Sequence, residues 1–177
     1  MKSNDKRDVM LMYILRKMTQ EEAEDIANNW HYKDEYSFYD MDADKEDLKE
    51  FLDPKQRGED MFVVVVDQDV IGYFCFNRVD KETIDIGLGM KPNLTGNGKG
   101  VEFLKSGLDF AKLTYNPGQL TLSVATFNHR AIKVYKTVGF EEVQTFMQST
   151  NGDCFEFIKM IYQCKEYAAK PISIFEK

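Results

Sequence analysis

The feature that most constrains this chain is a glycine-rich loop between a strand-like segment and a helix-like one. The segment Thr83 to Met90 has strand character, and Pro92 stops it because proline cannot donate to a strand ladder. The loop Thr95-Gly96-Asn97-Gly98-Lys99-Gly100 follows, and apolar residues then recur at helical spacing from about Gly98 to Leu113. A helix N-terminus carries unpaired amides and a partial positive charge, and glycines let the backbone approach an anion closely. The arrangement indicates either a phosphate-binding turn or a plain connection between a strand and a helix.

The spacing of the glycines excludes two common phosphate-binding loops. A nucleotide-hydrolase loop needs a glycine five residues before Gly-Lys-Ser/Thr, but here Gly98-Lys99 is followed by Gly100 and the earlier position holds Asn93. A dinucleotide-binding loop needs Gly-x-Gly-x-x-Gly, whereas Gly96, Gly98 and Gly100 alternate one by one. The loop therefore belongs to neither class.

The rest of the chain alternates between strand and helix signals. Thr19-Gln20-Glu21-Glu22 has the spacing of a capping box, Asn128 offers a helix N-cap, and Asn151-Gly152 is a strong hairpin signal. The predicted helices are Thr19 to Asn29, a short one from about Asp44 that ends at Pro54 to Gly58, Gly98 to Leu113, and Asn128 to Gly139. The predicted strands are Met10 to Met18, Phe62 to Val66, Val70 to Phe76, Thr83 to Met90, Leu120 to Ala125, Phe140 to Gln148 and Cys154 to Tyr162.

The size and composition fit one globular domain. The chain has 177 residues, of which 43% are hydrophobic and 30% charged. We expect a flexible tail over residues 1–9, the domain over 10–165 and a C-terminal extension over 166–177. The longest apolar run, Met61 to Val66, is far shorter than the roughly 20 residues of a spanning helix. The N-terminus lacks the apolar stretch of a secretory signal, so we expect a cytoplasmic protein with no membrane partner.

Charge and cysteine content bound the function further. The net charge of −7 and the lack of a block of Lys and Arg argue against a nucleic-acid partner. The same acidic balance suits a cationic substrate, or it serves only solubility. Cys75, Cys154 and Cys164 show no metal-ligand spacing, so we predict reduced packing residues and no metal site.

Two motifs resemble those of the GNAT acyltransferase superfamily. The loop is similar to the CoA-binding signature Gln/Arg-x-x-Gly-x-Gly/Ala, with Thr95 in the Gln/Arg position. Downstream, Asn128-x-x-Ala131-x-x-x-Tyr135-x-x-x-Gly139-Phe140 is similar to the second motif of that family. The hairpin over residues 62–76 and Asp85-Ile86-Gly87 also look like family features. The resemblance covers roughly residues 10 to 162.

The resemblance implies both a fold and an activity. The fold is a single α/β domain of the α+β type, with a mixed, mostly antiparallel central sheet of about seven strands and helices on both faces. Parallel strands before the glycine loop and after its helix would part at one end and admit acetyl-CoA. The activity is transfer of the acetyl group of acetyl-CoA, as co-substrate, to an amine by direct attack, with no metal and no covalent enzyme intermediate.

The resemblance also implies roles for individual residues. Tyr135 would be the general acid that protonates the leaving thiolate, although it also suits a packed aromatic on the inner helix stripe. Asp85 would accept the proton of the amine, in competition with a water chain, or it is a solvated strand residue. The residues expected to bind acetyl-CoA are Gly89, Met90, Thr95, Gly96, Asn97, Gly98, Lys99, Gly100 and Asn128. Of these, Gly89 and Met90 would offer backbone groups to the pantetheine arm, and Asn128 would both cap its helix and lie near that arm.

The acceptor is the least determined part of this interpretation. The aromatic segment Trp30 to Tyr39, with Asp34, Glu35 and Asp40, would either wall an acceptor pocket by cation–π contact or roof the core. A protein N-terminus, a polyamine, an amino sugar and an amino-acid derivative all fit as acceptors, and a homodimer is compatible with the sequence. Two other classes stay open, a CoA-binding regulatory module without turnover and a scaffold with an incidental glycine turn. His31 and His129 have no partners for a nucleophilic triad and are expected at the surface.

Overall fold

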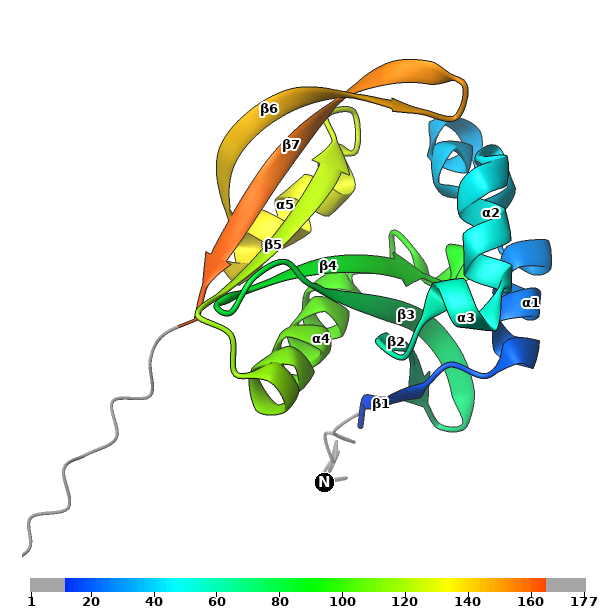
Figure 1. Ribbon diagram of the computed structural model, residues 1–177, viewed down its shortest axis with the longest axis horizontal. Helices are drawn as coiled ribbons and strands as arrows, with labels where there is room; N and C mark the ends of the chain where they lie inside the picture. The colour runs from blue at the N-terminus through cyan, green and yellow to red at the C-terminus, as the bar shows by residue number, and fades with distance from the viewer. Residues whose placement is uncertain (1–11, 165–177) are drawn as a thin grey trace, which may run out of the picture.

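The computed structural model describes residues 12–164, which form one sheet with helices on both sides (Figure 1). The expected tail at residues 1–9, the extension at 166–177 and the start of the predicted strand Met10 to Met18 lie outside the described residues. The strands are β1 (Ile14–Lys17), β2 (Met61–Val66), β3 (Asp69–Arg78), β4 (Thr83–Met90), β5 (Gln119–Ala125), β6 (Glu141–Thr150) and β7 (Asp153–Gln163). The α-helices are α1 (Gln20–Asn29), α2 (Lys45–Leu52), α3 (Pro54–Arg57), α4 (Gly100–Tyr115) and α5 (His129–Val138), and the 3-10 turns are η1 (Asp34–Tyr39), η2 (Met41–Ala43) and η3 (Pro92–Leu94).

The sheet has seven strands in the order β1-β2-β3-β4-β5-β7-β6. The β4 and β5 strands run parallel, and the other neighbouring pairs run antiparallel. This mixed, mostly antiparallel sheet confirms the predicted fold class.

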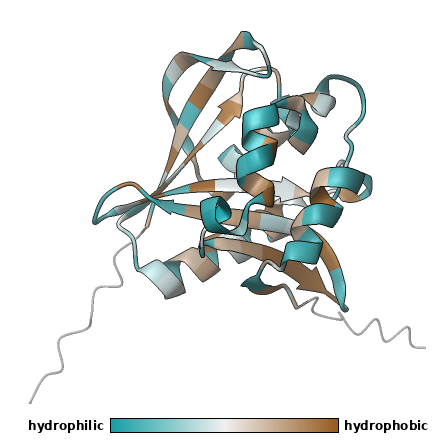
Figure 2. Cartoon of the chain, turned by 45° about the vertical axis from the view of Figure 1, so that its right-hand side comes forward, coloured by the Kyte–Doolittle hydropathy of each residue, from teal (hydrophilic) through white to brown (hydrophobic). Residues whose placement is uncertain are grey.

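The two faces of the sheet pack against different helices because side chains alternate along each strand. On one face, Phe74, Phe76 and Ile84 join the buried residues of α4 and α5 in the larger core. On the other face, Val63 lies under α1 and α2 in a second, smaller core. Figure 2 shows the hydrophobic colour on the central strands and the hydrophilic colour on the short helices in front of them.

Two glycines bring α4 close to β3. A Cβ added to Gly107 would stand 2.3 Å from the ring of Phe74, and one added to Gly72 would stand 2.4 Å from the ring of Phe103. Neither position has room for a side chain. The close approach fixes α4, and with it the glycine loop at its N-terminus, against the sheet.

The hairpin and cap predictions are confirmed where the local signal is strong. Thr19 and Glu22 form the capping box, and Asn128 Oδ1 accepts a hydrogen bond from the Ala131 amide at 3.2 Å. Asn151 and Gly152 both have positive φ, 52° and 76°, as a two-residue hairpin turn of the primed type requires.

Three details differ from the sequence prediction. The segment from Pro54 does not only end a helix but forms the short helix α3, because the Asp53 side chain accepts the Lys55 amide at 2.9 Å. Helix α4 begins at Gly100 rather than Gly98, whose φ of 75° is not helical. The predicted packing role is wrong for Cys154, which is exposed beside the hairpin turn, whereas Cys75 and Cys164 are half-buried.

Candidate active site

The site begins where β4 and β5 part. Their parallel pairing covers only Thr83, Ile84 and Asp85 on β4, opposite Gln119, Leu120 and Thr121 on β5. Beyond that point β4 continues beside β3 to Met90, and β5 continues beside β7 to Ala125. Figure 1 shows the two strands diverging. The predicted opening between parallel strands is therefore present.

The register of the sheet decides which backbone groups face this opening. The Lys91 amide donates to the Ile71 carbonyl at 2.9 Å, so Gly89, two residues earlier, also directs its amide and carbonyl toward β3. The alternate residues Leu88 and Met90 direct theirs away from β3, toward the opening. The prediction named Gly89 and Met90, and the structure puts the backbone of Met90 at the opening, with that of Leu88 in place of Gly89.

Two tyrosines of the aromatic segment reach the parted strands. The Tyr32 hydroxyl donates to the Met90 carbonyl on β4 at 2.8 Å, and the Ala125 amide on β5 donates to the Tyr39 hydroxyl at 3.3 Å. Burial raises the pKa of Tyr32 and of Tyr39 above their ordinary value. The segment therefore ties both edges of the opening together, a role that the sequence analysis missed because the partners lie far apart in the chain.

Tyr135 lies on α5 beside the same tyrosines. Burial, and then the neighbouring Tyr39 and Tyr32, raise the pKa of Tyr135 above its ordinary value of about 10. Its hydroxyl therefore stays protonated throughout the neutral range. Asn128 caps α5 with its side-chain oxygen, and the same side chain lies against Tyr39, where it partly offsets the rise in the Tyr39 pKa that burial causes.

Asp85 lies at the apex of the opening rather than with the tyrosines. Its Oδ1 accepts a hydrogen bond from the Thr121 hydroxyl at 2.5 Å, and both residues belong to the last parallel pair. Its neighbours Ile84 and Ile86 point into the core beneath α4, so Asp85 points to the opposite face. The structure thus brings Tyr135 and Asn128 together and sets Asp85 apart from them.

Two side chains of the glycine loop form hydrogen bonds to the turn that precedes it. The Thr95 hydroxyl donates to the Pro92 carbonyl at 2.8 Å, and the Asn97 side chain donates to the Asn93 carbonyl at 3.3 Å. Gly96 and Gly98 have φ of 77° and 75°, a backbone region that favours glycine. Lys99 occupies the N-cap position of α4 without a side-chain cap, so no side chain of the described residues caps the first turn of that helix. A Cβ on Gly100 would stand 3.0 Å from Val134, so this glycine also allows α4 to approach α5.

The family follows from a comparison with protein-family models. Residues 13–141 match the model described as the acetyltransferase (GNAT) domain. The chain belongs to the GNAT acetyltransferase family. No curated protein sequence is similar enough to match it.

Solved structures of other acetyltransferases share the fold. An acetyltransferase of the GNAT family from Bacillus anthracis superposes with a TM-score of 0.66 at 14% identity, covering 87% of this chain and 98% of that one. Spermidine N-acetyltransferase from Vibrio cholerae, in complex with CoA and spermine, gives 0.65 at 18% identity and covers 85% and 95%. The Campylobacter jejuni N-acetyltransferase PseH gives 0.60 at 22% identity and covers 85% and 97%.

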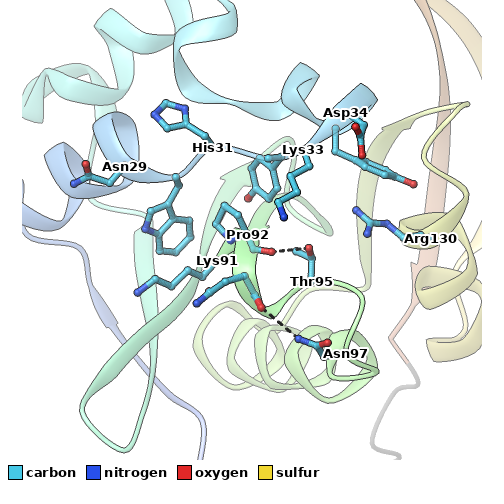
Figure 3. Close-up of a pocket in the computed structure, with 13 residues that line it drawn as sticks. Asn29, His31, Lys33, Asp34, Lys91, Pro92, Thr95, Asn97 and Arg130 are labelled. Carbon is cyan, nitrogen blue, oxygen red and sulfur yellow. Dashed lines mark hydrogen bonds between the residues drawn. The ribbon is translucent and has the colours of Figure 1, made fainter.

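This GNAT chain has a cavity of about 660 Å³ beside the glycine loop. Its wall combines the start of the aromatic segment, the turn before the loop and the first turn of α5, with Lys33, Asp34, Thr95 and Arg130 among the lining residues (Figure 3). Trp30 lines the cavity as well, and its indole nitrogen is buried without a hydrogen-bond partner within residues 12–164. A buried donor of this kind normally meets a ligand oxygen or a water molecule.

One group of side chains in this GNAT domain resembles a metal site. His31, Asp40 and Asp42 offer ligand atoms within 4.8 Å of one another. Both ring nitrogens of His31 already face oxygen atoms, Nδ1 the Asp40 carboxylate at 3.1 Å and Nε2 the Asn28 carbonyl at 3.0 Å. The Asp40 contact raises the pKa of His31, which lies at the surface, where it was expected. The described helices include none long and apolar enough to span a bilayer.

Proposed function

We propose that this GNAT-family acetyltransferase transfers the acetyl group of acetyl-CoA to a primary amine by direct attack in a ternary complex. The observation that carries the proposal is the opening between β4 and β5, which ends beside a glycine loop and a helix N-terminus without a side-chain cap. A long ligand with an anionic end suits that combination. CoA has this form, with a diphosphate at one end and a thioester at the other.

The residues present fit acetyl-CoA along its length. The amides around Gly96, Gly98 and Gly100 would hold the diphosphate at the N-terminus of α4. The backbone groups of Leu88 and Met90 would pair with the amides of the pantetheine arm, as an added strand does. The Met90 carbonyl already accepts the Tyr32 hydroxyl at 2.8 Å, so it would accept a pantetheine N–H with its second lone pair.

The chain's own groups would move the protons of the reaction. Bound acetyl-CoA supplies an activated acetyl thioester. The amine nitrogen forms a bond to the acetyl carbon, the carbon–sulfur bond breaks, and the departing sulfur needs a proton. Tyr135 is the proposed donor, since it is protonated at neutral pH and lies at the opening. Asp85 is the proposed acceptor of the amine proton, through a water chain because it lies at the apex of the opening.

We propose a cationic small molecule, such as a polyamine, as the first acceptor to test, with a protein N-terminus as the other class. The cavity is lined by Lys33, Lys91 and Arg130 as well as Asp34, so in the described part of the chain Asp34 is the one lining side chain whose charge would attract a cationic amine. Asp40 and Asp44 are engaged elsewhere, the first with His31 and Tyr32 and the second as the N-cap of α2. The net charge of −7 and the spermine in the Vibrio cholerae structure point the same way.

The proposal is tested by titrating acetyl-CoA and by measuring thiol release over a panel of amines. We expect saturable binding and amine-dependent release of CoA, with ternary-complex kinetics. Binding without thiol release above background hydrolysis would support the other candidate, a CoA-binding regulatory module. No affinity for acetyl-CoA would end both, and a trapped acetyl-enzyme would end the direct mechanism.

A further inference from the structure

Arg130 stands beside the glycine loop although it lies outside the loop motif. Its guanidinium carbon is 3.7 Å from the centre of the Tyr36 ring, a short cation–π distance. Its Nη1 is 3.6 Å from the place that a Cβ on Gly96 would occupy. The guanidinium is thus held between the aromatic segment and the loop proposed to bind the diphosphate.

The guanidinium has no acidic partner that would explain this position. Within residues 12–164, no carboxylate lies at ion-pair distance from Arg130, and its guanidinium packs on the Tyr36 ring. An arginine presents five N–H donors in a rigid fork suited to carboxylates and phosphates. A guanidinium that packs on an aromatic ring and has no carboxylate partner is well suited to bind an anionic ligand.

Lys33 adds a second cation to the same cavity. It precedes η1, and its carbonyl accepts the Tyr36 amide at 3.1 Å, so one turn fixes Lys33 and Tyr36 relative to each other. Figure 3 shows the Lys33 amine and the Arg130 guanidinium projecting into the cavity above Thr95, whereas Lys91 points away. Two positive charges therefore converge there in a chain of net charge −7.

The loop itself supplies little side-chain charge at the corresponding place. Thr95 stands where the family signature has Gln or Arg, and its hydroxyl is used by the Pro92 carbonyl. Backbone amides and the side chain of Lys99, at the N-cap of α4, then remain the loop's contribution. A guanidinium beside the loop would add to the balance of the two negative charges of a diphosphate bound there.

We propose that Arg130, positioned on Tyr36 and assisted by Lys33, binds the diphosphate of acetyl-CoA in place of the side chain that Thr95 lacks. The inference rests on the proposed function, since it names a ligand contact within the same site. Because Tyr36 belongs to η1, the proposal makes η1 part of the acetyl-CoA site as well as of the acceptor site. Salt weakens such a contact, because exposed charges are screened.

The test compares two charge-removing variants on one helix across three ligands. Arg130→Gln removes the proposed contact, and Lys133→Gln removes the same charge one turn further along α5, where the side chain is exposed and does not line the cavity. Dissociation constants are measured for acetyl-CoA, for acetyl-3′-dephospho-CoA and for S-acetylpantetheine, which has no phosphate. We expect Arg130→Gln to weaken the first two about tenfold to a hundredfold and to leave the third unchanged. Lys133→Gln should change none by more than about twofold.

Each other outcome overturns the inference. Equal losses in the two variants would assign the effect to net charge, and an equal loss for S-acetylpantetheine would assign it to altered structure. A loss that disappears with acetyl-3′-dephospho-CoA would move Arg130 to the 3′-phosphate. Wild-type protein that binds none of the three would instead refute the proposed function, which separates that failure from this one.

A double-variant cycle tests the positioning role of Tyr36. Tyr36→Leu should weaken acetyl-CoA binding in the wild-type background and have little further effect beside Arg130→Gln, because both changes act through the same guanidinium. Tyr36→Phe keeps the ring and should bind as wild type does. Independent, additive losses would show that Tyr36 does not act through Arg130.

Discussion

The surroundings of Tyr135 determine the protonation state of its hydroxyl. Burial beside Tyr39 and Tyr32 raises its pKa, so the phenol holds its proton at neutral pH, as the proposed donor must. We expect Tyr135→Phe to lower kcat by about 10²- to 10⁴-fold, the range typical of a lost general acid, with little change in acetyl-CoA affinity. Because the folded pKa lies above the ordinary value of about 10, no loss of rate from its ionisation should occur below that pH.

A tyrosine outside the opening provides the control for this substitution. Tyr115 at the end of α4 donates its hydroxyl to Asp60 at 2.8 Å and lies outside the proposed site. Tyr115→Phe should therefore keep kcat. A fully active Tyr135→Phe enzyme would remove Tyr135 as the acid and leave it as a packing residue.

Asp34 and Glu35 are neighbours in sequence with different places in the structure. Asp34 lines the cavity, and Glu35 is not among its lining residues. If the acceptor is cationic, Asp34→Asn should raise its KM about threefold to tenfold at unchanged kcat, and Glu35→Gln should have almost no effect. Asn also tolerates the positive φ of 54° at this position, so the backbone is preserved. Steady-state kinetics with a saturating acyl donor measure both, and equal KM values would remove Asp34 from acceptor recognition.

At the scale of elements, valine substitutions at two glycines separate the effect of backbone strain on stability from the effect of a lost ligand contact on affinity. Gly98 has φ of 75° and no atom within 4 Å of an added Cβ, and Gly152 in the β6–β7 turn has φ of 76° and equally open space. Valine at either position should cost about 1–2 kcal/mol of stability from the left-handed backbone. Only Gly98→Val should also weaken acetyl-CoA binding, by about tenfold or more, because its side chain would stand where the diphosphate meets the amides. Calorimetric titration of both variants distinguishes the two effects, and equal affinities would place the diphosphate elsewhere.

The elements that the sequence predicts well are those with local signals. The Thr19 capping box, the Asn128 cap and the Asn151-Gly152 turn each depend on residues a few positions apart, and the structure confirms all three. The parting of β4 and β5 was predicted from the family resemblance, not from periodicity, and the structure has it too.

The contacts that the sequence could not predict join distant segments. Tyr32 meets Met90 across 58 positions, and Tyr39 meets Ala125 across 86. Arg130 lies on Tyr36 for the same reason, since only the folded sheet brings the aromatic segment to α5. Residue type left open whether the aromatic segment lines a pocket or roofs the core, and no pattern in one sequence indicates which strand edge a tyrosine reaches. The choice between Gly89 and Leu88 likewise depends on strand register, which alternates with every residue.

At the scale of the whole molecule, the opening divides the sheet into two halves. One half contains β1 to β4 with the smaller core above it, and the other contains β5, β7 and β6. The three parallel pairs at the apex, the contact of α4 with α5 and the tyrosine hydrogen bonds connect them. A ligand that fills the opening would touch both halves at once, and it would bind only when they are correctly assembled.

Ligand-dependent thermal stability follows from that arrangement. Because acetyl-CoA would bind the folded chain and not the unfolded one, a concentration of 100 times Kd should stabilise the fold by about 2.7 kcal/mol. For a chain of this size each kcal/mol raises Tm by roughly 2–4 °C, so the expected shift is about 5–10 °C and should grow with the logarithm of ligand concentration. S-acetylpantetheine at the same concentration should give a much smaller shift, since it lacks the phosphates that the loop and Arg130 would hold. The Gly98→Val variant should also shift less than wild type at equal acetyl-CoA. A Tm that does not depend on acetyl-CoA, or that rises equally in wild type and Gly98→Val, would show that the opening and its glycine loop do not form one ligand site.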